Sequence, residues 1–187
     1  MKTRCPWLNL KNEEYVRYHD LEWGKPICDD DSLFAALIFE GAQAGLSWET
    51  VLKKRDEYLR VFNGLKIDEM AKISDEKLEK ALLNEGLIRN RLKIYSIRKN
   101  AIGIKKIQEC FGSFSGYLWG KVDYEQVPHR FKSMSDYPTE DGLSREISKE
   151  LKSYGLSFVG PTIIYAFLQA VGIYQDHSAD CFLGGNK

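Results

Sequence analysis

The chain has 187 residues, of which 43% are hydrophobic and 29% are charged. This length and composition are typical of a globular protein with one buried core, and they exclude a disordered or fibrous chain. Lysine plus arginine and aspartate plus glutamate number 27 each. No net charge therefore draws the whole molecule toward nucleic acid or an anionic membrane, and any such contact must come from a local patch.

The first residues, MKTRCPWLNLKNEEY, lack the apolar segment of a signal peptide. The longest apolar run, residues 158–174, is interrupted by Gly160, Pro161, Thr162 and Gln169, which favours a buried core helix over a membrane span. We therefore expect a cytoplasmic protein without a membrane partner. A monomer is expected as well, although neither observation bears on the oligomeric state. In that compartment, the four cysteines are expected to be metal ligands or free thiols rather than disulfides.

Helical periodicity dominates the N-terminal half of the chain. Asp29 to Asp31, Ser47 and Ser74 are expected to cap three helices, of which the first ends near Gly41 and the third at Gly86. After a short link, a long helix is predicted over about residues 91–111.

The C-terminal half repeats the helical pattern. An apolar stripe over residues 143–151 predicts a helix that stops at Gly155, and Pro161 suits the first turn of an apolar helix. Residues 112–139 are rich in proline, glycine and aromatic side chains, and are expected to form a packed connection. Because alternating strand patterns are scarce, we predict an all-α fold: one compact helical bundle over residues 1–187 with a pocket between its two lobes.

The stretch DHSADC near the end of the chain raises the question of a metal site. His177 and Cys181 are four positions apart, and Cys5 and His19 offer two more soft or imidazole ligands near the N-terminus. Together they form a Cys2His2 set, in which two thiolates neutralise Zn²⁺. Such a site would hold the two ends of the chain together.

The alternative is that these four residues are separate polar or core side chains, because the spacing from Cys5 to His19 is far wider than that of a usual zinc knuckle. If a metal binds, four protein ligands leave no open position for water, so its role is structural rather than catalytic. Cys28 and Cys110 are then expected to be small buried side chains. His129 has no evident partner in the sequence.

Aromatic residues and carboxylates gather between residues 15 and 48. Glu40 ends an otherwise apolar helix, where a buried carboxylate needs a partner or a cation. Aromatic faces beside an acid suit a flat, positively charged ligand. The alternative is that the aromatic rings belong to the core and that Glu40 is an exposed acid at a helix end. The aromatic set comprises Trp7, Tyr15, Tyr18, Trp23 and Trp48.

Four motifs together identify a family. YHDLEWG, FEGAQAGLSWETVLKKR, FVGPTIIYAFLQAVG and DHSADC resemble, in order and spacing, motifs of the 3-methyladenine DNA glycosylase I family. The resemblance extends over nearly the whole chain. It implies an all-α member of the helix-hairpin-helix glycosylase superfamily that carries a structural Zn²⁺. Such an enzyme flips out and excises 3-methyladenine from alkylated double-stranded DNA in base excision repair, and it leaves an abasic site.

The resemblance also assigns residues to roles. The zinc ligands fall on Cys5, His19, His177 and Cys181, and the catalytic carboxylate falls on Glu40. Substrate binding is implied for Tyr18 and Trp48, with Trp7, Trp23 and Tyr15 around them. The helix-hairpin-helix lies near residues 78–102. The DNA contacts that it implies are Gln43, Gly45, Leu46, Arg89, Arg91 and Lys93.

Two other functions are compatible with parts of this pattern. A base-binding alkylation sensor would keep the pocket without turnover, and Ala42, Leu92 and Ser157, which depart from the family pattern, are its support. A zinc hydrolase would require an open coordination position on the metal. Release of free base from methylated DNA separates the first alternative from a glycosylase, and a metal site with four protein ligands excludes the second.

Overall fold

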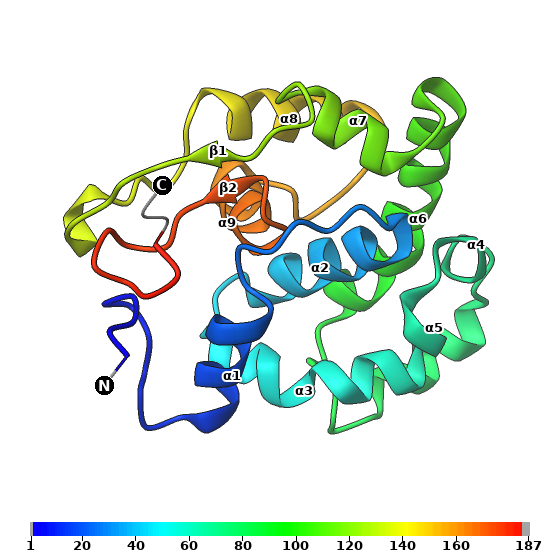
Figure 1. The fold of residues 1–187 in the computed structure, drawn as a ribbon. Helices are drawn as coiled ribbons and strands as arrows, with labels where there is room; N and C mark the ends of the chain where they lie inside the picture. The colour runs from blue at the N-terminus through cyan, green and yellow to red at the C-terminus, as the bar shows by residue number, and fades with distance from the viewer. Residues whose placement is uncertain (1, 185–187) are drawn as a thin grey trace.

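The computed structural model describes residues 2–184, and within that range the regular secondary structure is helical apart from one pair of two-residue strands (Figure 1). The prediction of an all-α fold is confirmed. The α-helices are α1 (Glu13–Leu21), α2 (Asp30–Gln43), α3 (Trp48–Val61), α4 (Ile67–Met70), α5 (Asp75–Leu82), α6 (Arg91–Phe111), α7 (Phe114–Gly120), α8 (Gly142–Ser153) and α9 (Pro161–Ala170). Two 3-10 helices, η1 (Asn63–Leu65) and η2 (Met134–Asp136), and the strands β1 (Val127–Pro128) and β2 (Tyr174–Gln175) complete the described chain.

Helix α2 lies at the centre of the molecule, with α3 on one side and α9 on the other (Figure 1). Most of its residues are buried, including those at its C-terminal end. It also packs against α6 and α7. A helix that is apolar all round must be enclosed by other elements, which is the position that α2 occupies. The end of α2 therefore places side chains in the interior rather than on the surface.

Asp30 fixes the start of α2 to the connection between α6 and α7. Its two carboxylate oxygens accept hydrogen bonds from the Gln108 side chain at 2.7 Å and from the backbone N–H groups of Phe114 and Ser115 at 2.8 Å each. A carboxylate at a helix N-terminus is favourable, and here it also satisfies N–H groups of the first turn of α7. This contact joins the two halves of the chain.

The predicted helix boundaries agree with the structure at most caps. Ser47 and Ser74 each accept a hydrogen bond from the backbone N–H three residues further along, and the long helix spans Arg91–Phe111. Gly155 follows α8 with a φ of 89°, a conformation that favours glycine. The prediction for Gly86 was wrong: α5 already ends at Leu82, and Gly86 lies in the turn before α6 without a positive φ.

The prediction of a packed connection over residues 112–139 is correct for α7, where Phe114, Tyr117, Leu118 and Trp119 are buried, but no residue between Lys121 and Asp141 is buried. Strand β1 pairs in parallel with β2, with Val127 opposite Tyr174. His129 does have a partner, since its Nδ1 lies 2.7 Å from the buried carboxylate of Asp176. The expectation of burial was wrong for Cys28 and Cys110, which are both exposed.

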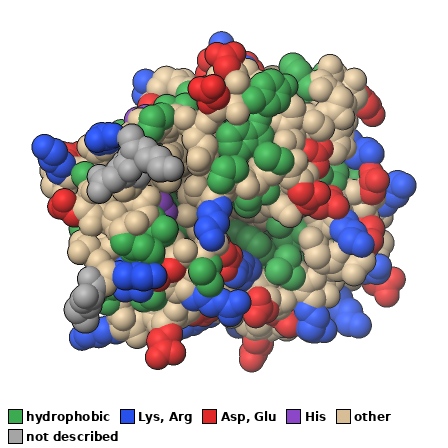
Figure 2. Space-filling model, in the orientation of Figure 1, with side chains coloured by type: hydrophobic (Ala, Val, Ile, Leu, Met, Phe, Trp, Pro, Cys, Tyr) green, Lys and Arg blue, Asp and Glu red, His purple; other side chains and the backbone are tan. Residues whose placement is uncertain are grey.

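The two ends of the described chain meet: the N–H of Phe182 donates to the carbonyl of Thr3 at 2.9 Å. Charged side chains of both signs are interspersed over the face drawn in Figure 2, which agrees with the balanced composition. None of the helices in residues 2–184 is long and apolar enough to cross a membrane.

Candidate active site and metal centre

A cavity of about 230 Å³ lies where α1, the end of α2, the start of α3 and α9 come together. Its volume is below the roughly 300–1,000 Å³ of a cavity for a drug-sized ligand, so it suits a single small ring system. We call it the aromatic cavity. It is lined by Trp7, Tyr15, Tyr18, Trp23, Glu40, Gln43, Trp48, Met134, Tyr137, Pro138, Ala166 and Gln169.

The aromatic side chains of the cavity form a continuous series of rings. Ring centroids are 4.8 Å apart for Trp7 and Trp23, 5.6 Å for Trp7 and Tyr15, 6.4 Å for Tyr15 and Tyr18, and 5.1 Å for Tyr18 and Trp48. Helix α1, capped by Asn12, places Tyr15 and Tyr18 three residues apart and so on one face. The structure thus brings together all five aromatic residues predicted for the pocket.

Glu40 brings a carboxyl group into this aromatic environment. The residue is only 5% exposed, and its carboxyl group forms no hydrogen bond or ion pair with any residue in the described part of the chain. Burial raises its pKa from 4.5 to about 8. A buried acid without a partner is costly, and such groups gather at functional sites. The carboxyl group is available to a ligand that supplies a proton donor or a positive charge.

A second cavity of about 360 Å³ adjoins the aromatic cavity, and its lining combines apolar residues such as Phe39 with the ion pair of Arg55 and Glu22. Tyr18, Glu40 and Trp48 line both cavities. The indole N–H of Trp48 is buried and has no acceptor among the described residues. Burial, reinforced by the charge of Glu40, raises the pKa of Tyr18, which therefore remains a hydroxyl group.

The segment after α2 forms an exposed turn beside the aromatic cavity. Gly45 adopts a φ of 75° in open space, and Leu46 is 41% exposed. Gln43 lines the cavity itself. A solvent-exposed leucine at the tip of a glycine turn next to a cavity is suited to contact a partner surface.

The turn between α5 and α6 forms a second exposed feature. Asn90 caps α6 by accepting a hydrogen bond from the N–H of Lys93 at 3.1 Å. The side chains of Arg89 and Arg91 are more than half exposed, and they pair with Glu85 and Glu79. Exposed ion pairs contribute little to stability, so both guanidinium groups can exchange their partners for phosphate groups at little cost.

Lys93 does not take the position expected of a phosphate contact. The residue is 9% exposed, and its ammonium group donates to the backbone carbonyls of Ala42 at 2.9 Å and Ala44 at 2.6 Å. Position alone did not distinguish it from Arg89 and Arg91. The structure separates the three: two cations lie at the surface and one lies against the end of α2.

The sequence did not identify the cavity residues of the C-terminal half. Met134, Tyr137 and Pro138 come from the irregular connection around η2, and Ala166 and Gln169 come from α9. One signal was available, because Gln169 is a polar residue in an apolar helix. Its amide N–H donates to the Asp176 carboxylate at 2.7 Å.

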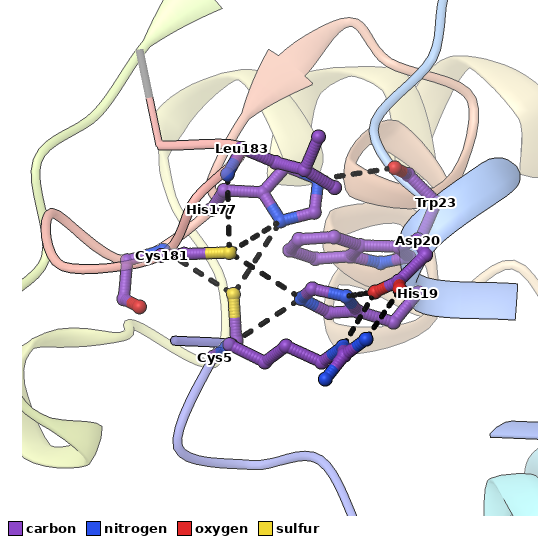
Figure 3. A network of polar contacts seen from close by, with 9 residues as sticks. Cys5, His19, Asp20, Trp23, His177, Cys181 and Leu183 are labelled. Atoms are coloured by element: carbon purple, nitrogen blue, oxygen red, sulfur yellow. Dashed lines mark hydrogen bonds and ion pairs between the residues drawn. The ribbon is translucent and has the colours of Figure 1, made fainter. Parts of the chain in front are cut away.

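Cys5, His19, His177 and Cys181 converge at the two ends of the chain (Figure 3). Their four ligand atoms all lie within 4.8 Å of one another, and all four residues are buried. Sulfur–nitrogen distances are 3.4 Å from Cys5 to His177, 3.6 Å from Cys181 to His19 and 3.7 Å from Cys181 to His177. A tetrahedral Zn²⁺ site separates its sulfur and nitrogen ligands by about 3.6 Å, so the donor set fits this ion.

Neighbouring groups orient the two histidine rings. His19 Nδ1 lies 2.8 Å from Asp20, whose carboxylate accepts two hydrogen bonds from Arg4, and His177 Nε2 lies 3.2 Å from the Trp23 carbonyl (Figure 3). Burial lowers the pKa of His177 to about 4 and lowers that of His19 as well. Both rings are therefore neutral, with Nε2 of His19 and Nδ1 of His177 facing the sulfur atoms, as metal binding requires.

The geometry defines a helical protein with a small aromatic cavity, a buried carboxyl group within it, and a separate buried cluster of two cysteines and two histidines that could hold a metal ion. Residues 7–184 match the model of the family described as methyladenine glycosylase. The chain is 40% identical over 181 residues to the DNA-3-methyladenine glycosylase of Haemophilus influenzae, covering 97% of each chain. It is also 38% identical over 185 residues to DNA-3-methyladenine glycosylase 1 of Escherichia coli, covering 98% of each.

Solved structures agree. A crystal structure of 3-methyladenine DNA glycosylase I superposes with a TM-score of 0.92 at 39% identity, covering 96% of this chain and 98% of that chain. A variant of such an enzyme in complex with 3-methyladenine gives a TM-score of 0.90 at 34% identity, covering 94% and 95%. The chain belongs to the methyladenine glycosylase family.

Proposed function

We propose that the protein is a monofunctional DNA glycosylase that excises 3-methyladenine from alkylated DNA by hydrolysing the N-glycosidic bond. The observation that carries this conclusion is the aromatic cavity with the buried, unpartnered Glu40 at its wall. The family assignment and the relatives that act as DNA-3-methyladenine glycosylases support it.

The chemistry of the substrate suits this cavity. A purine methylated at N3 carries a positive charge, and its glycosidic bond is weakened because the base leaves as a neutral molecule. The enzyme therefore needs little acid catalysis. It must take the damaged nucleotide out of the duplex, and the cost of flipping is lowest for a poorly stacked base.

Recognition of the base would fall to the rings and to Glu40. A flat cation placed against the ring faces of Tyr18 and Trp48 that line the cavity gains stacking and cation–π energy, worth about 1–3 kcal/mol for a stacked base. The Glu40 carboxylate would accept a hydrogen bond from the exocyclic amino group of adenine. A cationic ligand favours the charged form of the acid, so binding would draw the raised pKa of Glu40 downward.

As the base departs, positive charge develops on the deoxyribose, and a carboxylate beside the cavity would stabilise that charge before water adds at C1′. No lysine is among the described residues that line the cavity. The ammonium group of Lys93 is held by backbone carbonyls. We therefore expect hydrolysis to leave an abasic site without cleavage of the strand.

Contacts with DNA would come from the two exposed turns. Gln43 lines the cavity, and Gly45 and Leu46 follow it in the exposed turn, from which the leucine would fill the gap left by the flipped nucleotide. Arg89 and Arg91 would bind phosphate groups from the turn between α5 and α6, which we assign to a helix-hairpin-helix. We also expect the protein to act as a monomer in the cytoplasm.

Cys5, His19, His177 and Cys181 would hold a structural Zn²⁺. When bound, the ion supplies cross-linking rather than reaction chemistry, because four protein ligands leave no position for water or substrate. This donor set argues against the zinc hydrolase alternative. The reaction is assigned to the aromatic cavity.

The experiment is incubation of the purified protein with methylated duplex DNA, followed by chromatographic identification of the released bases. We expect free 3-methyladenine from the wild-type protein. For Glu40→Gln, which keeps the shape of the side chain, we expect release slower by about 10–100-fold, the equivalent of about 1.4–2.7 kcal/mol. Release at the wild-type rate from folded Glu40→Gln protein would remove Glu40 from the mechanism. Binding without any release by the wild type would favour the alkylation sensor.

A further inference from the structure

Lys93 is a buried cation that the proposed reaction does not use. It occupies the third position of α6, where the positive end of the helix dipole disfavours a cation. Its ammonium group lies instead at the C-terminal end of α2, where it donates to Ala42 and Ala44 at 2.9 and 2.6 Å. Desolvation lowers the pKa of Lys93, and the end of α2 offsets part of that cost.

The carbonyl groups of Ala42 and Ala44 depend on Lys93 for a hydrogen-bond donor. No backbone N–H in the described part of the chain donates to the carbonyl oxygen of Ala42 or Ala44. The turn is otherwise held by two backbone bonds, from Ala44 to Gly41 at 3.3 Å and from Leu46 to Gln43 at 2.7 Å. The last carbonyls of a helix need a donor, and here a side chain from another helix supplies it.

The two elements that Lys93 joins have different parts in the proposed reaction. The end of α2 and the following turn carry Glu40, Gln43 and Leu46, which line or flank the aromatic cavity. The start of α6 follows directly from the turn with Arg89 and Arg91. The other polar side-chain contact between α2 and α6 lies at the opposite end of α2, where Gln108 donates to Asp30 at 2.7 Å, and apolar side chains of the core lie between the two ends.

We propose that Lys93 is a positioning residue that fixes the turn of residues 43–46 relative to the DNA-binding start of α6. A duplex held by the α5–α6 turn then meets Leu46 and Glu40 at a fixed distance. Without the ammonium group, the turn can move relative to α6. A misplacement of about 1 Å at a reacting centre lowers the rate by a factor on the order of 100. This inference rests on the proposed function of the aromatic cavity.

The test compares Lys93→Met, which keeps the length of the stem, with Lys99→Met, which removes an exposed lysine from the same helix. Release of 3-methyladenine is measured in single turnover with saturating enzyme. Affinity is measured over a series of salt concentrations with a duplex that carries a stable abasic-site analogue. For Lys93→Met we expect a rate about 10–100-fold below wild type, an affinity within about twofold, and an unchanged dependence of log Kd on log salt, because no phosphate contact is lost.

A phosphate contact would give the opposite pattern. In that case Lys93→Met would release base at the wild-type rate under saturating conditions, while the slope of log Kd against log salt would fall by about one. That result overturns the proposal, and so does a variant indistinguishable from Lys99→Met. Arg91→Met is the positive control for the altered slope.

A second readout does not depend on turnover. Amide hydrogen exchange at Ala44–Leu46 should be faster in Lys93→Met than in wild type and unchanged in Lys99→Met; equal exchange in all three proteins overturns the proposal. If wild-type protein releases no base, the proposed function fails while this readout still tests Lys93. If Lys93→Met does not fold, Lys93→Gln, which retains a neutral donor, replaces it. Its rate of base release should then lie below that of wild type, and its amide exchange at Ala44–Leu46 should be faster than in wild type, with both effects smaller than those expected for Lys93→Met.

Discussion

Glu40 is a carboxylic acid placed where its charged form is poorly solvated. Burial among aromatic rings raises its pKa to about 8, and no described side chain compensates for this. The unfolded chain does not share the cost, because there the group titrates near its ordinary value. The buried acid therefore lowers the free energy of unfolding of the free protein. Such a loss is common at functional sites, whose residues suit a ligand rather than the stability of the fold.

This burial predicts a pH dependence of stability. Between about 4.5 and about 8 the folded chain keeps a proton on Glu40 that the unfolded chain releases, so the free energy of unfolding should decrease as the pH rises. The slope for one such group is up to about 1.4 kcal/mol per pH unit. Glu40→Gln removes the titration, so it should exceed wild type in melting temperature by a margin that widens from pH 5 to pH 8. A constant margin over this range would contradict the buried, unpaired state of Glu40.

At the residue scale, the sequence predicted those parts of the site whose chemistry is unusual for their position. An acid at the end of an apolar helix and a dense group of aromatic residues indicated the cavity. The sequence could not separate Lys93 from Arg89 and Arg91, because the burial of a cation depends on which helix packs against it. Gln169 was missed for the same reason, since its role follows from contacts between α9 and the rest of the cavity.

At the scale of single elements, the end of α9 depends on a glycine. Gly172 adopts a φ of 75°, and a Cβ atom at this position would lie 2.3 Å from the carbonyl carbon of Lys25. The close approach allows the N–H of Ile27 to donate to the carbonyl of Val171 at 3.0 Å. This contact attaches the segment after Trp23 to the end of α9.

We therefore expect Gly172→Ala to lower the free energy of unfolding by about 2–5 kcal/mol, from left-handed backbone strain and from the clash together. Gly64→Ala is the matched control, because Gly64 has a similar φ of 74° but nothing within 4 Å of a Cβ. It should cost only about 1–2 kcal/mol. Denaturant unfolding of both variants measures the difference, and equal losses would show that packing against Lys25 is unimportant.

Local signals predicted the elements better than their mutual arrangement. Ser47, Ser74 and Pro161 each mark a helix start that depends only on nearby residues, and these positions are confirmed. Gly86 resembled a helix end, but α5 ends at Leu82. The Gly86 backbone packs instead against the side chain of Glu57 in α3, a tertiary contact that periodicity does not reveal.

At the scale of the whole molecule, the cluster of Cys5, His19, His177 and Cys181 joins segments that are far apart in the sequence: Cys5 and His177 are 172 positions apart. If Zn²⁺ binds there, its binding free energy is available only to the folded chain. Cys181→Ser should then lower the melting temperature by at least about 6 °C, because each kcal/mol shifts a chain of this length by roughly 2–4 °C. Base release at low temperature should remain.

The control for this prediction is Cys110→Ser, which changes an exposed thiol outside the cluster and should leave the melting temperature within about 1 °C. The metal content of both proteins, measured by mass spectrometry, links stability to the ion. Loss of base release from folded, stable Cys181→Ser protein would contradict a purely structural role and would assign the cluster a part in the reaction.

The meeting of Thr3 and Phe182 has a mechanical consequence. Thr3 and Phe182 are hydrogen-bonded to each other, so a force that pulls these two residues apart acts first on this bond and on the cluster of Cys5, His19, His177 and Cys181. The helices come under tension only afterwards. If Zn²⁺ binds the cluster, pulling the chain at Thr3 and Phe182 should therefore give an early rupture whose force falls when the ion is removed, followed by the opening of the helices. The same proximity means that a short linker could close the chain into a ring, with new ends cut elsewhere, and leave the helical core undisturbed.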